Sequence, residues 1–148
     1  DEDARTAWVA QSNRDMEWAQ VDLQRLSSIH AIQVNFDEYG ANQKGAVSGV
    51  YQSYLIYASV NGEDWSLVVD YGTKKTDTPH DYIEFEEPFK ARYIKLQNKE
   101  YMVSENFSVR DLRIFGKGQG STPRAVNDFT VERDEADPCK ARLWRQVV

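Results

Sequence analysis

Hydrophobic and polar residues alternate along most of this chain with a period of two, which is the spacing of a strand with one buried face. The clearest case is residues 30–36, where one side carries His30, Ile32, Val34 and Phe36. Similar short runs occur at 54–58, 65–71, 83–85, 92–97 and 109–115. No segment shows the 3.6-residue period of a convincing amphipathic helix. The pattern predicts an all-β domain, built as an antiparallel β-sandwich or jelly roll.

Turn-forming residues separate these expected strands. Asn61-Gly62 follows the run at 54–58, and this pair favours a tight hairpin because both residues accept positive φ. We therefore expect 65–71 to be the return strand. Pro88 cannot donate a hydrogen bond to a ladder, so it should end the strand at 83–85.

The composition changes near Gly116, where a Gly-rich and Ser-rich stretch begins. We expect a main β-sandwich over residues 1–117, a linker over 118–124 and a tail over 125–148. The tail shows two further strand-like runs, at 126–131 and 141–148. Because two strands seldom form a domain of their own, the tail is either the opening of a neighbouring β-sandwich or a hairpin docked onto the main one.

The charge balance narrows the choice of partners. The chain of 148 residues has 24 acidic and 18 basic side chains, a formal net charge of −6. Nucleic acids and anionic membranes select clustered Lys and Arg, so both are disfavoured as partners. A single cysteine, Cys139, excludes an intramolecular disulfide. The chain shows no signal peptide and begins without Met, so we read it as a piece of a longer protein.

Signatures of catalysis are missing from the sequence. It contains no HExxH, no Gly-x-Ser-x-Gly, no P-loop and no dinucleotide-binding fingerprint. Cys139 has no histidine near it in sequence. We therefore expect a binding module rather than an enzyme.

An ordered set of motifs resembles the discoidin domain, also called the coagulation factor V/VIII type C domain. The motifs are Thr6-Ala7-Trp8, Trp18-Ala19-Gln20-Val21-Asp22-Leu23, Tyr54-Leu55-Ile56, Ser59 to Trp65, Arg92-Tyr93-Ile94-Lys95 and Leu112-Arg113-Ile114-Phe115-Gly116. The likeness covers residue 1 to about residue 117. Members of this family usually carry a further strand or two before the segment at which this chain begins, so the first strand of the sandwich would be absent, or its place would be filled by the C-terminal strands.

The resemblance implies a function. Bacterial relatives include the family 32 carbohydrate-binding modules, and the tail from Ala125 resembles the start of a fibronectin type III domain. Together they imply the C-terminal part of a bacterial glycoside hydrolase, of the family 43 type, that is secreted, periplasmic or on the cell surface. The domain would be non-catalytic and would bind a polysaccharide or oligosaccharide of plant or host origin, beside a catalytic domain in the same parent chain. Two alternatives stay open: a protein-interaction or adhesion domain, and a spacer that packs on the catalytic domain without a ligand.

Loops at one end of the sandwich are the expected ligand site, because a rigid scaffold can display them. Sugar sites combine an aromatic platform with hydrogen-bonding side chains. The candidates are Tyr39, Asn42 and Gln43 in the first loop, Lys74, Lys75, His80 and Tyr82 in the second, and Tyr101, Asn106 and Phe107 in the third. Trp8, Trp18 and Trp65 are instead expected in the core, because Trp8 and Trp18 match core positions of the family and Trp65 closes the hairpin.

Two further groups of residues have expected roles. Asp1, Asp3 and Thr6 crowd oxygen donors together, which suits a hard cation such as Ca²⁺. The resemblance implies a structural Ca²⁺ at that segment, with Asp111 as a further ligand. Arg92 has a guanidinium that could bind the carboxylate of Asp22 with two hydrogen bonds, in a structural role.

Overall fold

The computed structural model describes residues 7–37, 49–118, 130–134 and 137–144. All the regular secondary structure in these ranges is β-strand, which confirms the all-β prediction. The described residues include no helix that is long and apolar enough to cross a membrane. The strands are β1 (Trp8–Val9), β2 (Trp18–Phe36), β3 (Gln52–Ser59), β4 (Ser66–Tyr71), β5 (His80–Tyr101), β6 (Ser108–Gly118), β7 (Thr130–Asp134) and β8 (Asp137–Trp144).

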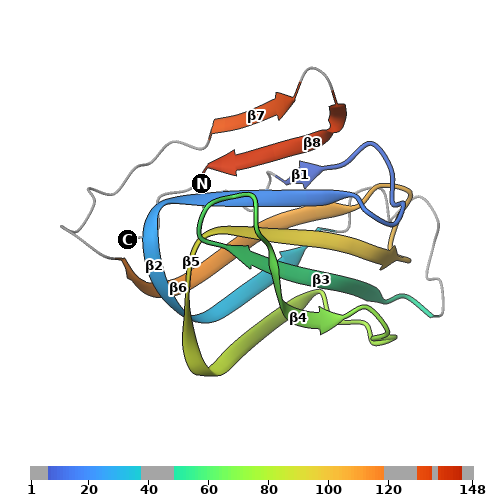
Figure 1. Ribbon diagram of the computed structural model, residues 1–148. Helices are drawn as coiled ribbons and strands as arrows, with labels where there is room; N and C mark the ends of the chain where they lie inside the picture. The colour runs from blue at the N-terminus through green and yellow to red at the C-terminus, as the bar shows by residue number, and fades with distance from the viewer. Residues whose placement is uncertain (1–6, 38–48, 119–129, 135–136, 145–148) are drawn as a thin grey trace.

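The two long strands, β2 and β5, each contribute to both layers of the molecule. Their neighbours follow the order β1-β6-β2-β5-β3-β4. Residues 18–22 of β2 pair with 93–97 of β5, whereas 27–35 pair with 80–91 of β5 and also with β6. The register shifts between Asp22 and Ser27, where β2 curves over in Figure 1. One hydrogen-bonded sheet thus folds onto itself, with β3 and β4 in one layer and β1 and β6 in the other, which confirms the β-sandwich.

The hydrophobic core lies between these layers and follows the alternation in the sequence. The inward positions at 3% exposure or less include Val21, Ile56, Ile94, Ile32, Val34 and Ile114. Aromatic side chains fill one end of the core. The ring centroid of Phe36 lies 5.2 Å from that of Tyr54, 6.0 Å from that of Tyr101 and 6.1 Å from that of Phe107. This dense packing makes that end of the sandwich a rigid base for the loops that leave it.

The strand expected at 83–85 does not end at Pro88, and that prediction is wrong. β5 continues through the proline to Tyr101. Ile29 pairs with Phe89 and Ala31 pairs with Glu84, so residues 85–88 have no partner on β2. Because Pro88 lies in this interruption of the ladder, its missing N–H costs no hydrogen bond.

The connection between β3 and β4 is longer than the expected two-residue turn. It spans residues 60–65, and of the Asn61-Gly62 pair only Gly62 has a positive φ, of 83°. Asn61 acts through its side chain instead. Its Oδ1 accepts hydrogen bonds from the backbone N–H groups of Glu63 and Asp64 at 3.0 and 2.9 Å. An Asx-type turn therefore replaces the predicted tight turn.

Trp18 and Trp65 lie outside the core, contrary to expectation, and His30 does not share the buried face of Ile32, Val34 and Phe36. Trp18 is half-buried, and the ammonium of Lys95 lies 5.3 Å from its ring centroid and 3.8 Å from that of Trp65. Trp18 shares the outer face of β2 with Asp22, because the inward positions are Ala19 and Val21. His30 is exposed since the register shifts between Ile29 and Ala31. Trp8 is half-buried and packs edge-on against Phe107, as a packing role requires.

Strands β7 and β8 of the tail form a hairpin that lies beside the first part of β2. β7 and β8 pair with each other in antiparallel fashion, and β8 pairs in parallel with residues 18–22 of β2. This is the one parallel pairing among the described strands. β6 extends to Gly118, the first residue of the expected linker, and residues 119–124 lie outside the described ranges.

Candidate ligand-binding site

Three described loops meet at one end of the sandwich: residues 10–17, 72–79 and 102–107. The first and third are joined by backbone hydrogen bonds, from Ala10 N–H to the Phe107 carbonyl at 2.8 Å and from Phe107 N–H to the Ser12 carbonyl at 2.9 Å. The second is joined to the end of β2 by a bond from Phe36 N–H to the Pro79 carbonyl at 2.9 Å. We call this region the loop end. The expected ligand residues Tyr39, Asn42 and Gln43 lie outside the described residues.

Tyr101 and Phe107, which the sequence placed in an exposed loop, belong to the core. They are 1% and 0% exposed, and their ring centroids lie 5.4 Å apart. The hydroxyl of Tyr101 donates to the backbone carbonyl of Asp37. Neither ring can reach a ligand at the surface, so their assignment to the ligand site is wrong. Both residues border a short loop, and their apolar rings are covered by the layers on either side.

Lys74 and Asn106 are engaged in contacts that shape the loop end. The ammonium of Lys74 forms an ion pair with Asp81 at 2.5 Å, and Asp81 also accepts a hydrogen bond from the Tyr54 hydroxyl at 2.7 Å. Burial, and then the hydrogen bond to Asp81, raise the pKa of Tyr54 far above its usual value. Asn106 donates from Nδ2 to the carbonyl of Ala10 at 3.0 Å. These two side chains therefore hold the scaffold rather than face a ligand.

The loop at 10–17 is part of the same end, although sequence reasoning did not select it. Asn13 donates from Nδ2 to the carbonyls of Tyr101 and Ser104, at 3.2 and 2.9 Å. Asn98 donates from Nδ2 to the carbonyls of Asn13 and Arg14, at 2.7 and 2.9 Å. The signal was present in the sequence as a polar run, Gln11 to Asp15, between two strand-like segments.

The exposed side chains of the loop end include charged residues and two methionines. Lys75 pairs with Glu100 and donates to the Tyr51 hydroxyl at 2.8 Å, with its ammonium 4.5 Å from the Tyr51 ring centroid. The hydrogen bonds to Glu100 and Tyr51 raise the pKa of Lys75. Two methionines in this region, Met16 and Met102, are 63% and 54% exposed. The Tyr51 ring is thus covered in part by Lys75 and is not an open platform.

His80 and Tyr82 lie on a different surface, the outer face of the layer made by β2, β5 and β6. Tyr82 pairs with Gln33, and His80 pairs with Asn35. On the other side of β2, Gln33 pairs with Arg113 and Ala31 pairs with Phe115. Cross-strand partners share a face, so this surface gathers one set of side chains. We call it the Tyr82 face: Gln33, Asn35, His80, Tyr82, Arg113 and Phe115.

An aromatic pair forms the centre of the Tyr82 face. The rings of Tyr82 and Phe115 meet edge to face with centroids 5.8 Å apart. Ala31 lies between their strands and is 0% exposed, because its small side chain lets the two rings close over it. Tyr82 itself is 54% exposed, which makes it the most exposed tyrosine among the described residues. Phe115 therefore holds a ring that remains accessible to a ligand.

Polar groups surround that ring on the side of the loop end. Gln33 donates from Nε2 to Asn35 Oδ1 at 3.3 Å, and His80 Nδ1 lies 3.1 Å from the same oxygen. These contacts order the three side chains. The side-chain oxygen Oε1 of Gln33 and the imidazole nitrogen Nε2 of His80 make no hydrogen bond with other described residues. A fixed aromatic ring beside amide and imidazole groups matches what a sugar ring with hydroxyls requires.

Of the four expected calcium ligands, only Asp111 lies among the described residues. Asp1, Asp3 and Thr6 lie outside the described residues. Asp111 is on β6, opposite Asn35, and its carboxylate pairs with Arg113. In the described part of the chain, no group of three or more His, Cys, Asp and Glu side chains could hold a metal ion. Ca²⁺ binding by Asp111 therefore remains a proposal, and it would compete with Arg113 for the carboxylate.

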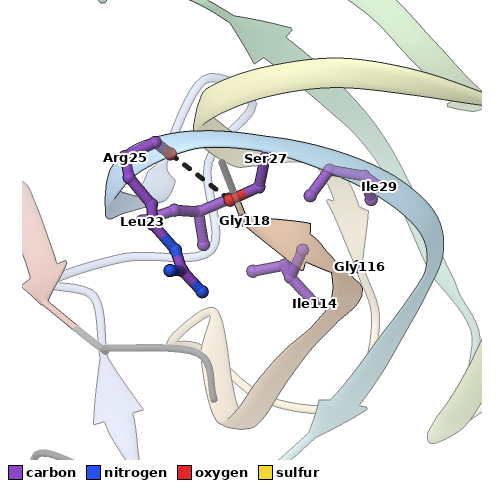
Figure 2. Close-up of a pocket in the computed structure, with 7 residues that line it drawn as sticks. All are labelled: Leu23, Arg25, Ser27, Ile29, Ile114, Gly116 and Gly118. Carbon is purple, nitrogen blue, oxygen red and sulfur yellow. Dashed lines mark hydrogen bonds between the residues drawn. The ribbon is translucent and has the colours of Figure 1, made fainter. Parts of the chain in front are cut away.

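A small hollow lies at the other end of the sandwich, between the bend of β2 and the end of β6. Leu23, Ile29 and Ile114 line it, and the side chain of Arg25 extends over it in Figure 2. Its cavity volume is about 10 Å³, which is room for about one water molecule. The hollow is thus too small and too covered to be the main ligand site.

Comparison with known proteins agrees with this architecture. A family model described as the F5/8 type C domain matches residues 1–112. Lactadherin of Rattus norvegicus is 34% identical over 96 residues, which cover 61% of this chain and 21% of lactadherin. The chain therefore spans about a fifth of the length of this curated relative.

Solved structures show the same fold at low sequence identity. One is the carbohydrate-binding module CBM32-1 from a family 31 glycoside hydrolase of Clostridium perfringens, with 21% identity, a TM-score of 0.63 and coverage of 78% of this chain and 80% of the module. Another is chitosan-binding module 1 of a chitosanase/glucanase from Paenibacillus sp. IK-5, with 19% identity, a TM-score of 0.63 and the same coverage. At these identities the likeness establishes the fold.

Proposed function

Because this chain belongs to the F5/8 type C, or discoidin, domain family, whose members are non-catalytic binding modules, we propose that it binds carbohydrate. Two structural neighbours, a family 32 module and a chitosan-binding module, carry names that state such a role for them. The fold supplies the scaffold, and the contact surface must be argued from the side chains of this chain.

The observation that carries the proposal is the exposed ring of Tyr82 within the Tyr82 face. Phe115 fixes the ring from one side, and Gln33 and His80 stand beside it. A pyranose offers an apolar C–H face that packs on such a ring, and its hydroxyls both donate and accept hydrogen bonds. The side-chain amide of Gln33 and the imidazole of His80 can both donate and accept hydrogen bonds. The formal net charge of −6 does not oppose a neutral sugar.

We place the ligand on the part of this face nearest the loop end. His80 is the first residue of β5 and Asn35 is next to the last residue of β2, so both stand where the sheet meets the loops. A single shallow contact of this kind gives modest affinity. Linked to a catalytic domain in the same parent chain, such a module raises the effective concentration of polysaccharide near that domain. The proposed setting is a secreted or cell-surface glycoside hydrolase acting on plant or host glycans.

Affinity electrophoresis in gels that contain xylan, arabinan or galactan tests the proposal directly. At least one polymer should slow the intact chain, and calorimetry with the retained polymer then gives its affinity. Tyr82→Ala should weaken binding about tenfold or more, since it removes the ring on which the sugar packs. His80→Ala should weaken it less, because it removes one hydrogen-bonding group.

Leu67→Ala is the matched control. Leu67 is an exposed apolar residue, at 47%, on β4 in the other layer. Its removal should leave retention unchanged. Retention that survives Tyr82→Ala would move the sugar site away from the Tyr82 face. No retention by any polymer would overturn carbohydrate binding and favour the spacer role.

A second candidate, binding to an anionic membrane surface, is favoured by one observation at the loop end. Met16 and Met102 are exposed there, and Lys75 and Lys99 are present on neighbouring strands and loops. Apolar side chains among lysines suit a lipid interface. Both lysines are paired with carboxylates, which weakens this candidate. Sedimentation with phosphatidylserine vesicles would support it if binding fell in a Met16→Ser, Met102→Ser double variant.

A further inference from the structure

Glu17 and Asn98 face each other across β2 and β5 at the loop end of the core. The β2–β5 pairing ends at Trp18 and Gln97, and Glu17 and Asn98 are the residues that adjoin this last pair. The N–H of Asn98 donates to the carbonyl of Glu17 at 2.7 Å, and the carbonyl of Asn98 accepts from the N–H of Met16 at 3.2 Å, so Asn98 lies opposite both residues. Alternation puts Glu17 on the inward side with Ala19 and Val21. The two side chains are 6% and 0% exposed.

Each of these side chains has one oxygen without a hydrogen-bond partner. Asn98 uses its Nδ2 for two carbonyls, those of Asn13 and Arg14. Ser12 donates its hydroxyl to Glu17 Oε1 at 2.6 Å. In the described part of the chain, Glu17 Oε2 and Asn98 Oδ1 are buried and have no partner. A flip of the Asn98 amide would not help, because it would break both bonds to the carbonyls.

With Glu17 ionised, both orphan atoms are acceptors, so neither can donate to the other. A buried carboxylate without a compensating charge is costly, and buried charges in proteins are usually paired or bound to metal. No described Lys or Arg forms an ion pair with Glu17. Lys99, the lysine next to Asn98, pairs with Asp15 at 2.6 Å instead. The pair thus needs a positively charged or hydrogen-donating group from outside the described side chains.

We propose that Glu17 and Asn98 hold a hard metal cation beneath the loop at 10–17. Carboxylate and amide oxygens are the ligands that Na⁺, K⁺ and Ca²⁺ prefer, and soft metals would require sulfur or imidazole. The site differs from the one proposed at Asp1, Asp3, Thr6 and Asp111. Its cation offsets the charge of Glu17 and fastens the loop to β5, which stabilises the loop end without taking part in ligand contact.

Thermal unfolding of the full 148-residue chain, stripped of metal with a chelator, tests the site. Melting curves are recorded in NaCl, KCl or CaCl₂ and compared with choline chloride at equal ionic strength. One of the metal cations should raise the melting temperature by roughly 3–5 °C for each tenfold excess over its dissociation constant. Glu17→Gln should abolish that rise, since it removes the charge while keeping the shape.

Two further variants separate this site from others. Glu63→Gln removes an exposed carboxylate from the loop at 60–65 and should keep the full response. Asp111→Asn removes the other proposed calcium ligand and should keep the part of the response that depends on Glu17. A melting temperature that responds to no metal cation beyond choline, or a response unchanged in Glu17→Gln, would overturn the proposal.

Crystals give a direct measurement that does not depend on the stability of a variant. Rubidium and terbium stand in for potassium and calcium, and both scatter anomalously. An anomalous peak between Glu17 Oε2 and Asn98 Oδ1 is the expected result. If crystals grown with rubidium and crystals grown with terbium both show density no stronger than that of a water molecule, the site holds a bridging water only. That result would overturn the cation proposal.

Discussion

Arg92 binds Asp22 with two parallel hydrogen bonds, from Nε to Oδ1 and from Nη2 to Oδ2, each 2.9 Å long. The Asp22 side chain is 3% exposed, whereas that of Arg92 is 41% exposed. Asp22 Oδ1 also accepts a bond from Gln24 N–H at 2.6 Å, and Gln24 has a positive φ of 61°. The carboxylate therefore fixes the point at which β2 leaves one layer for the other, and Arg92 ties that corner to β5.

Arg92→Met should destabilise the chain, because it keeps the apolar stem but leaves the buried carboxylate of Asp22 with fewer donors. Removing one partner of such a pair is costly, and the partial exposure of Arg92 moderates the cost to about 1–3 kcal/mol. Urea unfolding followed by circular dichroism measures the change. Lys99→Met is the control, since the Lys99–Asp15 pair is exposed and its loss should have no measurable effect. Equal midpoints for the two variants would contradict a structural role for Arg92.

Gly116→Ala should also destabilise the chain, at the far end of the sandwich. A Cβ at position 116 would lie 2.3 Å from the backbone oxygen of Ser28, which cannot move without disturbing β2. The expected loss is about 1–3 kcal/mol, the usual cost of overpacking. Gly72→Ala is the comparison, because there the nearest atoms, at 3.2 and 3.3 Å, belong to the side chains of Asp70 and Leu55. A Gly116→Ala variant as stable as Gly72→Ala would show that β2 and β6 can separate cheaply.

The period-two pattern was sufficient to predict the fold class, because alternation records which side of each strand meets the core. It could not predict that β2 and β5 are single long strands that serve both layers. That continuity depends on local devices, such as Gln24 with its positive φ and the unpaired stretch around Pro88. The sequence shows these as breaks, and only pairing between distant segments shows that the strand continues beyond them.

Site prediction succeeded where it rested on chemistry between residues and failed where it rested on loop position. The Asp22–Arg92 pair was predicted from the fit of guanidinium to carboxylate and is confirmed. Tyr101 and Phe107 were assigned by position and proved buried. The Glu17–Asn98 pair gave no signal, since the residues are 81 positions apart (98 − 17) and only the β2–β5 register brings them together.

Phe107→Ala should lower stability without a specific loss of ligand binding. The ring is 0% exposed and packs against Trp8, Phe36 and Tyr101. Its removal should cost about 3–5 kcal/mol by creating a cavity. Tyr82→Ala should show the opposite pattern, with binding reduced and the unfolding midpoint nearly unchanged. Denaturant titration and affinity electrophoresis on both variants separate the two effects, and a folded Phe107→Ala protein that has lost only binding would restore Phe107 to the ligand site.

Tyr54 should make the chain less stable at alkaline pH. Burial and the hydrogen bond to Asp81 raise the pKa of Tyr54 well above the value of ~10 that it has in the unfolded chain. A group whose pKa is raised on folding contributes its full stability below the unfolded pKa, so nothing is lost up to about pH 10. Above it, the unfolded state releases a proton that the folded state retains, and stability falls by about 1.4 kcal/mol for each further pH unit.

The comparison with Tyr54→Phe isolates this effect from the other tyrosines. The variant loses the bond to Asp81 and should be less stable than the native chain by about 1 kcal/mol at pH 8. It has no hydroxyl to ionise, so its stability should fall less steeply from pH 10 to 11, and the two curves should meet near pH 11. Guanidinium unfolding at intervals between pH 8 and 11 gives both curves. A difference that stays constant with pH would mean that the Tyr54 hydroxyl ionises as readily in the folded chain as in the unfolded one.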